Sequence, residues 1–131
     1  MTYRIPVTVE FSIGSADVTD EMVAPIIEAL KTESTPKACV AIKRFACNAA
    51  IVNPETKKKF RNNFELSAMR SVNVMQKLIS MGITEDRIII GEYAGAVGSD
   101  DSEAERSKNR KVEATVYVSY DIVGTAASQP Q

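Results

Sequence analysis

The stretch that most constrains the fold runs from residue 63 to residue 82 and reads NFELSAMRSVNVMQKLISMG. Read as a helix, it places Asn63 and Arg70 seven residues apart, two turns along one stripe of its surface. Gly82 follows the last helical position, where helices commonly end. This pattern predicts a helix that presents an amide and a guanidinium from its first two turns and packs along an adjoining uncharged face, formed by Ser71, Val74, Met75, Leu78 and Met81.

Two segments near the ends of the chain alternate apolar and polar residues in the manner of half-buried strands. In the first segment the apolar positions are Ile5, Val7, Val9, Phe11 and Ile13. Because proline lacks an N–H donor, Pro6 places this strand at an edge of the sheet or marks its start. In the last segment the apolar positions are Val112, Ala114, Val116, Val118 and Tyr120.

Further elements are predicted between these two strands. Residues 38–46 form one strand, and residues 87–93, centred on three consecutive isoleucines, form another that we expect to be buried on both faces. A helix follows a cap at Thr19 or Asp20, and Pro25 predicts that this helix starts late or bends. A stretch rich in Gly, Ser and Asp at 94–104 predicts a loop.

The order β-α-β-α-β-(α)-β predicts an α+β fold, a two-layer sandwich of helices on a mixed four-stranded sheet. At 131 residues the chain has the length of about one domain. We expect residues 1–123 to form that single domain and residues 124–131 to be a disordered tail.

Composition excludes several classes of function. Sixteen basic and seventeen acidic residues give a net charge of −1, which indicates neither nucleic acid nor an anionic membrane as a partner. No apolar run reaches the length of about 18 residues that a membrane-spanning helix needs. No signal peptide is visible, so we expect a cytoplasmic protein or a domain cut from a longer, exported chain.

Catalytic chemistry is also poorly supported. The chain has no histidine, the commonest general base and zinc ligand, and it has no paired-carboxylate or metal-cluster signature. If Cys39 and Cys47 share one strand they lie about 26 Å apart, whereas a disulfide needs Cα atoms within about 7 Å. A catalytic Cys47 would need a base as its partner. We therefore expect no enzyme, no metal and no cofactor.

Four spaced motifs resemble one family. They are FxxxSAxxT at 11–19, NxxLSxxR at 63–70, LxxxGIxxDRI at 78–88 and RxxNRKV at 106–112. Together they are similar to the C-terminal domain of the OmpA-like (OmpA/MotB/Pal) family, over about residues 7–120. The resemblance implies a domain of the periplasm and cell envelope that holds peptidoglycan non-covalently, through the diaminopimelate side chain of its stem peptide.

The free end of diaminopimelate is a zwitterion, so its pocket needs a guanidinium for the carboxylate and a carboxylate for the ammonium. By resemblance, Arg70 grips the carboxylate and Asn63 is a polar contact near the same helix start. Arg110 is the second basic residue that the family places near the pocket. The helix N-terminus also favours an anion there.

Two departures from the family pattern affect this site. Where the family carries the aspartate that receives the ammonium, this chain has Cys47, and Arg44 replaces a glycine. A neutral thiol cannot balance an ammonium, and removing one partner of a buried pair costs about 3–5 kcal/mol. The segment 48–62 is also longer than the family's loop, which predicts a new wall for the pocket, and within it Glu55 is a candidate replacement carboxylate.

Each site residue also has a structural interpretation. Arg70 can bond backbone carbonyls near the second and fourth strands, and Asn63 can cap its helix. Arg106 and Arg110 can pair with nearby acids, namely Glu103, Glu105 or Glu113.

Two functions remain open. One is peptidoglycan binding with weakened or altered recognition. The other is a degenerate module that acts as a structural or interaction domain, with other proteins of an envelope complex such as a secretion system as its partners.

Overall fold

The computed structural model describes residues 2–32, 38–47, 49–96 and 102–119. Along the chain, the helices and strands within these ranges are β1 (Thr2–Glu10), α1 (Asp20–Thr32), β2 (Cys39–Phe45), α2 (Pro54–Lys59), α3 (Asn63–Ser80), the short 3-10 helix η1 (Glu85–Arg87), β3 (Ile88–Gly95), α4 (Glu103–Ser107) and β4 (Lys111–Ser119). None of the helices within these ranges is long and apolar enough to cross a membrane.

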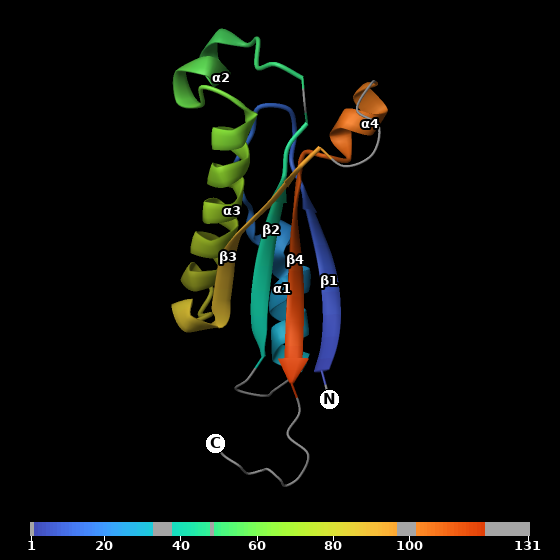
Figure 1. The fold of residues 1–131 in the computed structure, drawn as a ribbon. Coiled ribbons are helices and arrows are strands. Elements are labelled where there is room, and N and C mark those ends of the chain that lie inside the picture. Colours follow the sequence, from blue (N-terminus) through green and yellow to red (C-terminus); the bar gives the residue numbers. More distant parts are fainter. Residues whose placement is uncertain (1, 33–37, 48, 97–101, 120–131) are drawn as a thin grey trace, which may run out of the picture.

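The four strands form one mixed sheet in the order β1-β4-β2-β3. β4 is antiparallel to both of its neighbours, with Glu10 opposite Lys111 on one side and Cys39 opposite Tyr117 on the other. β2 and β3 are parallel. Helices α1 and α3 cover one face of this sheet, and α2 and α4 lie at one end of it (Figure 1). The predicted α+β sandwich with a mixed four-stranded sheet is therefore confirmed.

The core lies between the sheet and the two long helices. Strand residues that face the helices are buried at every second position, as Val40 and Ile42 show in β2, because side chains alternate across a strand. The helices contribute residues at helical spacing, such as Val74 and Leu78 of α3. The same cluster includes Val9, Val23, Ile26, Leu30, Val112, Ala114 and Val116.

Gly82 ends α3 as the sequence predicts. Its backbone has a φ of 102°, a conformation that favours glycine. Its N–H donates to the Ile79 carbonyl at 3.0 Å, and the N–H of Ile83 donates to the Leu78 carbonyl at 3.0 Å. This pair of bonds is the Schellman motif, which satisfies carbonyls that the end of the helix would leave without partners.

The expectation that the isoleucine-rich strand is buried on both faces is wrong. β3 is one of the two edge strands of the sheet, and β2 is its neighbour. Ile88 packs against the core, but Ile89 is 56% exposed and Ile90 is 37% exposed. A short apolar run indicates a strand without indicating its place in the sheet, and here the strand order decides the burial.

Three boundaries also differ from expectation. β1 ends at Glu10; Phe11 beyond it is buried, whereas Ile13 is exposed because the chain has already left the ladder. Helix α1 does not start late: it begins at Asp20 with Pro25 inside it. The predicted loop at 94–104 lies partly in β3 and α4.

The cap predicted at Thr19 is present, since its hydroxyl accepts a hydrogen bond from the Met22 N–H at 3.3 Å. Residues 97–101 of the predicted loop, and the predicted tail at 124–131, lie outside the described residues.

Candidate functional site

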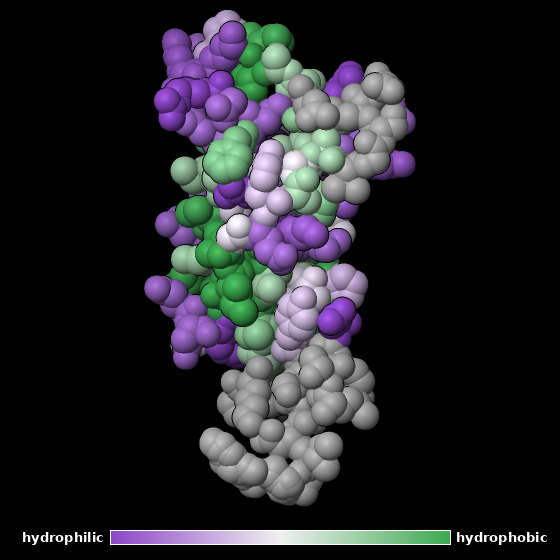
Figure 2. Space-filling view, in the orientation of Figure 1, coloured by the Kyte–Doolittle hydropathy of each residue, from purple (hydrophilic) through white to green (hydrophobic). Residues whose placement is uncertain are grey.

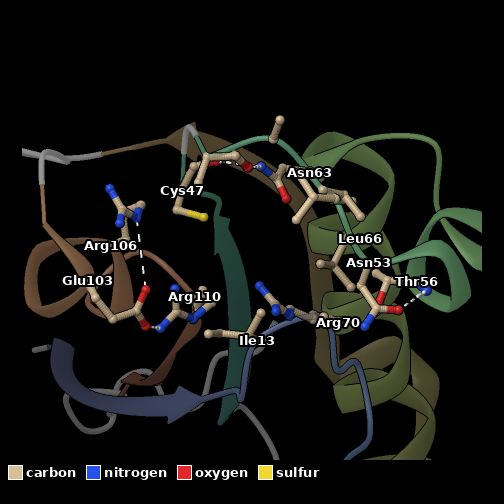
Figure 3. Close-up of a pocket in the computed structure, with 15 residues that line it drawn as sticks. Ile13, Cys47, Asn53, Thr56, Asn63, Leu66, Arg70, Glu103, Arg106 and Arg110 are labelled. Carbon is tan, nitrogen blue, oxygen red and sulfur yellow. Dashed lines mark hydrogen bonds and ion pairs between the residues drawn. The ribbon is translucent and has the colours of Figure 1, made fainter.

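A cavity of about 130 Å³ lies at the N-terminal end of α3. Its walls come from the loop after β1, the segment between β2 and α3, the first turns of α3, and α4 with the residues that follow it (Figure 3). The structure brings together all the site residues predicted from the sequence, because the lining includes Cys47, Asn63, Arg70 and Arg110.

Arg70 is held by backbone carbonyls. Its side chain is only 2% exposed, and its Nε and Nη2 donate to the carbonyl oxygens of Ser15 and Ser12 at 2.8 and 3.2 Å. The guanidinium carbon lies 5.1 Å from the centre of the Phe11 ring. The prediction that Arg70 bonds backbone carbonyls is therefore confirmed, but their predicted location near the second and fourth strands is wrong, since these carbonyls belong to the loop after β1.

Burial of the Arg70 guanidinium has an electrostatic cost. Loss of surrounding water lowers its pKa to about 10. The interaction with Cys47 acts on the Arg70 pKa in the opposite direction, and the positive charge of Arg110 adds to the lowering. The group remains protonated at neutral pH, so an anion in the cavity would meet a positively charged wall.

Asn63 does not cap α3. The cap is Asn62, whose side-chain oxygen accepts the Glu65 N–H at 3.0 Å. The side-chain amide of Asn63 instead donates to the carbonyl oxygens of Cys47 and Ala49, at 2.9 and 2.5 Å. Asn63 therefore ties the segment after β2 to the start of α3.

The longer segment after β2 does supply a wall of the cavity, through residues 49–53 and Thr56. This wall packs tightly against the loop after β1. Gly14, at a φ of 69°, approaches Thr56 so closely that a Cβ added to the glycine would lie 2.8 Å from the Thr56 hydroxyl. A glycine is needed at this position for both its backbone conformation and this contact.

Neither candidate for the ammonium partner is a carboxylate in the cavity. Cys47 is a half-buried free thiol on the cavity wall, and Cys39 is also free. Glu55 lies outside the lining and forms an exposed ion pair with Lys58 at 3.2 Å. The proposed replacement of the family's aspartate by Glu55 is therefore wrong.

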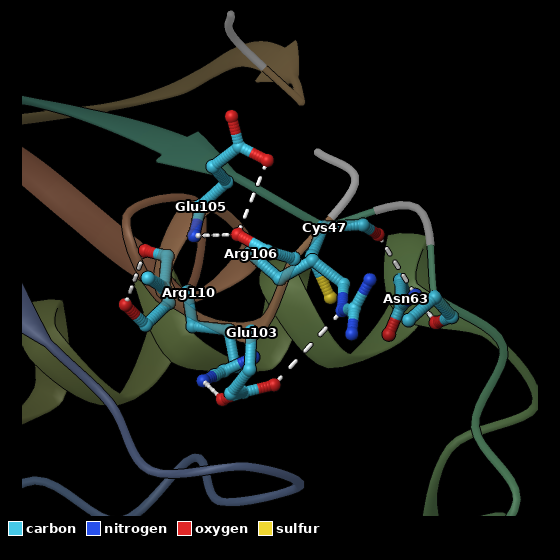
Figure 4. Close-up of polar contacts among 10 residues, drawn as sticks. Cys47, Asn63, Glu103, Glu105, Arg106 and Arg110 are labelled. Atoms are coloured by element: carbon cyan, nitrogen blue, oxygen red, sulfur yellow. Dashed lines mark hydrogen bonds and ion pairs between the residues drawn. The ribbon is translucent and has the colours of Figure 1, made fainter. Parts of the chain in front are cut away.

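Sequence reasoning missed Glu103 as the acidic residue of the cavity. Glu103 forms an ion pair with Arg110 and a longer one, at 3.9 Å, with Arg106 (Figure 4). The pairing of these arginines with a nearby acid was predicted, but the position of that acid in the pocket was not. The available signal was spacing, because Glu103, Arg106 and Arg110 follow one another at intervals of three and four residues.

The described lining therefore carries three guanidinium groups, those of Arg70, Arg106 and Arg110, against one carboxylate. Such a site attracts a carboxylate-bearing ligand and offers little to an ammonium group. Among the described residues, no cluster of His, Cys, Asp and Glu is arranged to hold a metal ion.

No family model and no curated protein matches this sequence. Solved structures with the same fold include a MotB-like protein from Desulfovibrio vulgaris, with 24% identity, a TM-score of 0.67, and coverage of 88% of this chain and 74% of that chain. The cell wall anchor of the type VI secretion system from Pseudomonas aeruginosa has 24% identity and a TM-score of 0.66, with coverage of 88% and 82%. The periplasmic domain of Helicobacter pylori MotB has 20% identity and a TM-score of 0.64, with coverage of 95% and 86%. The chain thus has the fold of OmpA-like and MotB C-terminal domains.

Proposed function

We propose that this chain is a domain of the cell envelope, exposed to the periplasm, that binds the peptidoglycan stem peptide non-covalently and without catalysis. The observation that carries the proposal is the cavity in which Arg70, Arg106 and Arg110 surround a space large enough for a carboxylate group. The shared fold supports it, because one of the solved structures is described as a cell wall anchor.

We further propose that recognition is weaker than at an intact zwitterion site. The carboxylate of diaminopimelate can be received by the guanidinium groups, but its ammonium meets the thiol of Cys47. Glu103 does not compensate, because Arg110 and Arg106 already neutralise its charge. An unbalanced ammonium reduces binding by about two orders of magnitude or more.

The proposal is tested by cosedimentation of the purified chain with diaminopimelate-containing sacculi. Wild type should bind weakly, and Cys47→Asp should bind at least about tenfold more tightly because it restores the missing charge. Cys47→Asn is the matched control, similar in size to aspartate but neutral, and should give no gain. Tight binding by wild type, equal to that of Cys47→Asp, would contradict weakened recognition.

A second measurement separates the two ends of the ligand. A soluble stem peptide whose diaminopimelate ammonium has been acetylated should bind wild type as well as the unmodified peptide does. The same acetylation should weaken binding to Cys47→Asp. If the added aspartate brings no gain with either peptide, the wall formed by residues 49–53 has closed the site.

A second candidate function is an interaction domain within an envelope complex such as a secretion system. One observation favours it: exposed apolar side chains lie along α3 and β3, away from the cavity. This function predicts no sacculus binding by wild type or by Cys47→Asp, together with binding of another envelope protein at that apolar surface.

A further inference from the structure

Apolar side chains gather where α3 contacts β3. On α3, one stripe at helical spacing is apolar throughout: Phe64, Ala68, Val72, Met75 and Ile79. On β3, Ile90 and Tyr93 face the same side, since they pair with Ile42 and Arg44 on the helix-covered face of β2. We call these seven residues the α3–β3 seam. Figure 2 shows apolar side chains gathered over α3 and β3.

The seam is exposed over much of its length. Phe64 is 52% exposed and Tyr93 45% exposed, although their rings contact each other edge to face with 5.0 Å between centres. Ile90 and Ile79 are each 37% exposed. Large apolar side chains left exposed in one contiguous row are typical of a surface that binds a partner.

The two edges of the sheet differ in how they are protected. β1 carries Pro6, which has no N–H donor, and exposed charges at Arg4 and Glu10, features that discourage pairing with another strand. β3 begins with three consecutive isoleucines and has Glu92 as its charged residue. Its ladder to β2 is regular from Ile88 to Ile90, before the first register shift. No described strand pairs with the outer side of these three residues, which leaves it able to accept an added strand.

Arg44 brings a positive charge to the seam, and its guanidinium contacts two aromatic rings there. Its guanidinium carbon lies 4.4 Å from the ring centre of Phe64 and 5.0 Å from that of Tyr93. Its Nε is buried and has no hydrogen-bond partner among the described residues. The residue as a whole is only half-buried, and a carboxylate supplied by another molecule matches both the charge and the planar geometry of its guanidinium.

We propose that the α3–β3 seam binds an extended segment of a partner protein that adds as a strand beside Ile88–Ile90. Alternate apolar residues of this segment pack on the seam, and an acidic residue near one end reaches Arg44. The proposal goes beyond peptidoglycan binding and does not depend on it, since none of the seven seam residues lines the cavity.

A second copy of this chain is a poorer fit. Two β3 strands paired about a two-fold axis perpendicular to the sheet keep their helix-covered faces on the same side. Glu92 pairs with Lys43, one position from Arg44, and so points to the opposite face of the sheet. The β3 carboxylate of a second copy therefore lies on the wrong face to meet Arg44.

The test is selection from a library of random ten-residue peptides displayed on phage, using the whole chain as bait. Enriched peptides should alternate apolar residues and carry an Asp or Glu. Their affinity, measured with synthetic peptides by fluorescence polarisation, should fall about tenfold or more for Ile90→Lys and for Arg44→Gln. Thr8→Lys, on the other edge strand, is the matched control and should bind as wild type does. Backbone amides of Ile88–Ile90 should exchange more slowly when peptide is bound.

Several results would overturn the proposal. One is the absence of enrichment above an empty-bead selection, and another is enrichment of peptides without acidic residues. A third is that the Ile90→Lys variant, shown by circular dichroism to be folded, binds the peptides as tightly as wild type does. A wild-type dimer in sedimentation equilibrium that Ile90→Lys dissociates would assign the seam to self-association instead. Sacculus binding should be the same for wild type and Ile90→Lys, so failure here and failure of the peptidoglycan proposal can be told apart.

Discussion

The guanidinium of Arg70 donates two hydrogen bonds inside the protein while the rest of the group lines the cavity. Its two acceptors, Ser12 and Ser15, flank the turn that carries Ile13 and Gly14, which also line the cavity. The residue therefore shapes the site as well as charging it. A substitution at Arg70 tests stability and binding together, which is why the binding experiment above changes Cys47 instead.

The first prediction concerns the structural role of Arg70. Arg70→Leu removes both hydrogen bonds and leaves the carbonyls of Ser12 and Ser15 without these partners. We expect the free energy of unfolding, measured with urea and far-UV circular dichroism, to fall by about 2 kcal/mol. Lys57→Leu, at an exposed position on α2, is the control and should change it by less than about 0.5 kcal/mol. Unchanged stability of Arg70→Leu would show that the loop after β1 holds without this anchor.

The second prediction separates the two neighbouring asparagines at the start of α3. Asn63→Ala removes the bonds to the carbonyls of Cys47 and Ala49, so amides at 49–53 should exchange with solvent more rapidly in mass-spectrometric hydrogen exchange. Asn62→Ala removes the helix cap and should cost about 1 kcal/mol without changing that exchange. Equal exchange at 49–53 in the two variants would contradict the assigned roles.

Residue types at the site were predictable from the sequence, but the partners of Arg70 and Asn63 were not. Cys47, Asn63, Arg70 and Arg110 were all placed at one pocket, and all line it. Their contacts depend on loops whose paths carry no periodic signal. For that reason the acceptors of Arg70 could not be derived before the structure, and for Glu103 the sequence offered only its spacing from Arg106 and Arg110.

At the scale of elements, the spacing of apolar residues and the positions of glycine predicted the features that depend on neighbours in the sequence. The alternation in β1 and β4, the apolar face of α3 and the glycine that ends α3 follow from neighbours in the chain. The exposure of β3 depends on the order β1-β4-β2-β3, which is set by pairing between distant segments. The isoleucine run at 88–90 is equally compatible with a central strand and with an exposed edge that binds a partner.

The third prediction concerns the contact between the loop after β1 and α2. Gly14→Ala and Gly82→Ala each place a side chain at positive φ and should each destabilise by about 1 kcal/mol or more. Only the first also pushes against Thr56, because nothing lies within 4 Å of a Cβ added at Gly82. In double-mutant cycles measured by urea unfolding, Thr56→Ala should therefore relieve part of the cost of Gly14→Ala and none of the cost of Gly82→Ala. Strict additivity in both cycles would rule out the contact.

At the scale of the molecule, α3 connects two surfaces with different chemistry. One end of the helix presents Asn63 and Arg70 to a positively charged cavity, and one flank presents an apolar stripe to β3. Arg44 and the three arginines of the cavity thus serve different surfaces. The sequence placed Arg44 only as a replacement for a family glycine, since its two aromatic neighbours come from α3 and β3 and meet only in the folded chain.

The last prediction concerns the chain as a folding unit. The buried cluster joins residues of α1, α3 and all strands except β3, and Ile88 of β3 packs against it, so the chain should unfold in one cooperative step. Because the chain has four tyrosines and no tryptophan, tyrosine fluorescence and far-UV circular dichroism should report the same urea midpoint. A chain that stops after residue 123 should share that midpoint, as expected for a tail that takes no part in the core. Two separated transitions would contradict a single domain, and a lower midpoint for the shortened chain would show that residues 124–131 contribute to the fold.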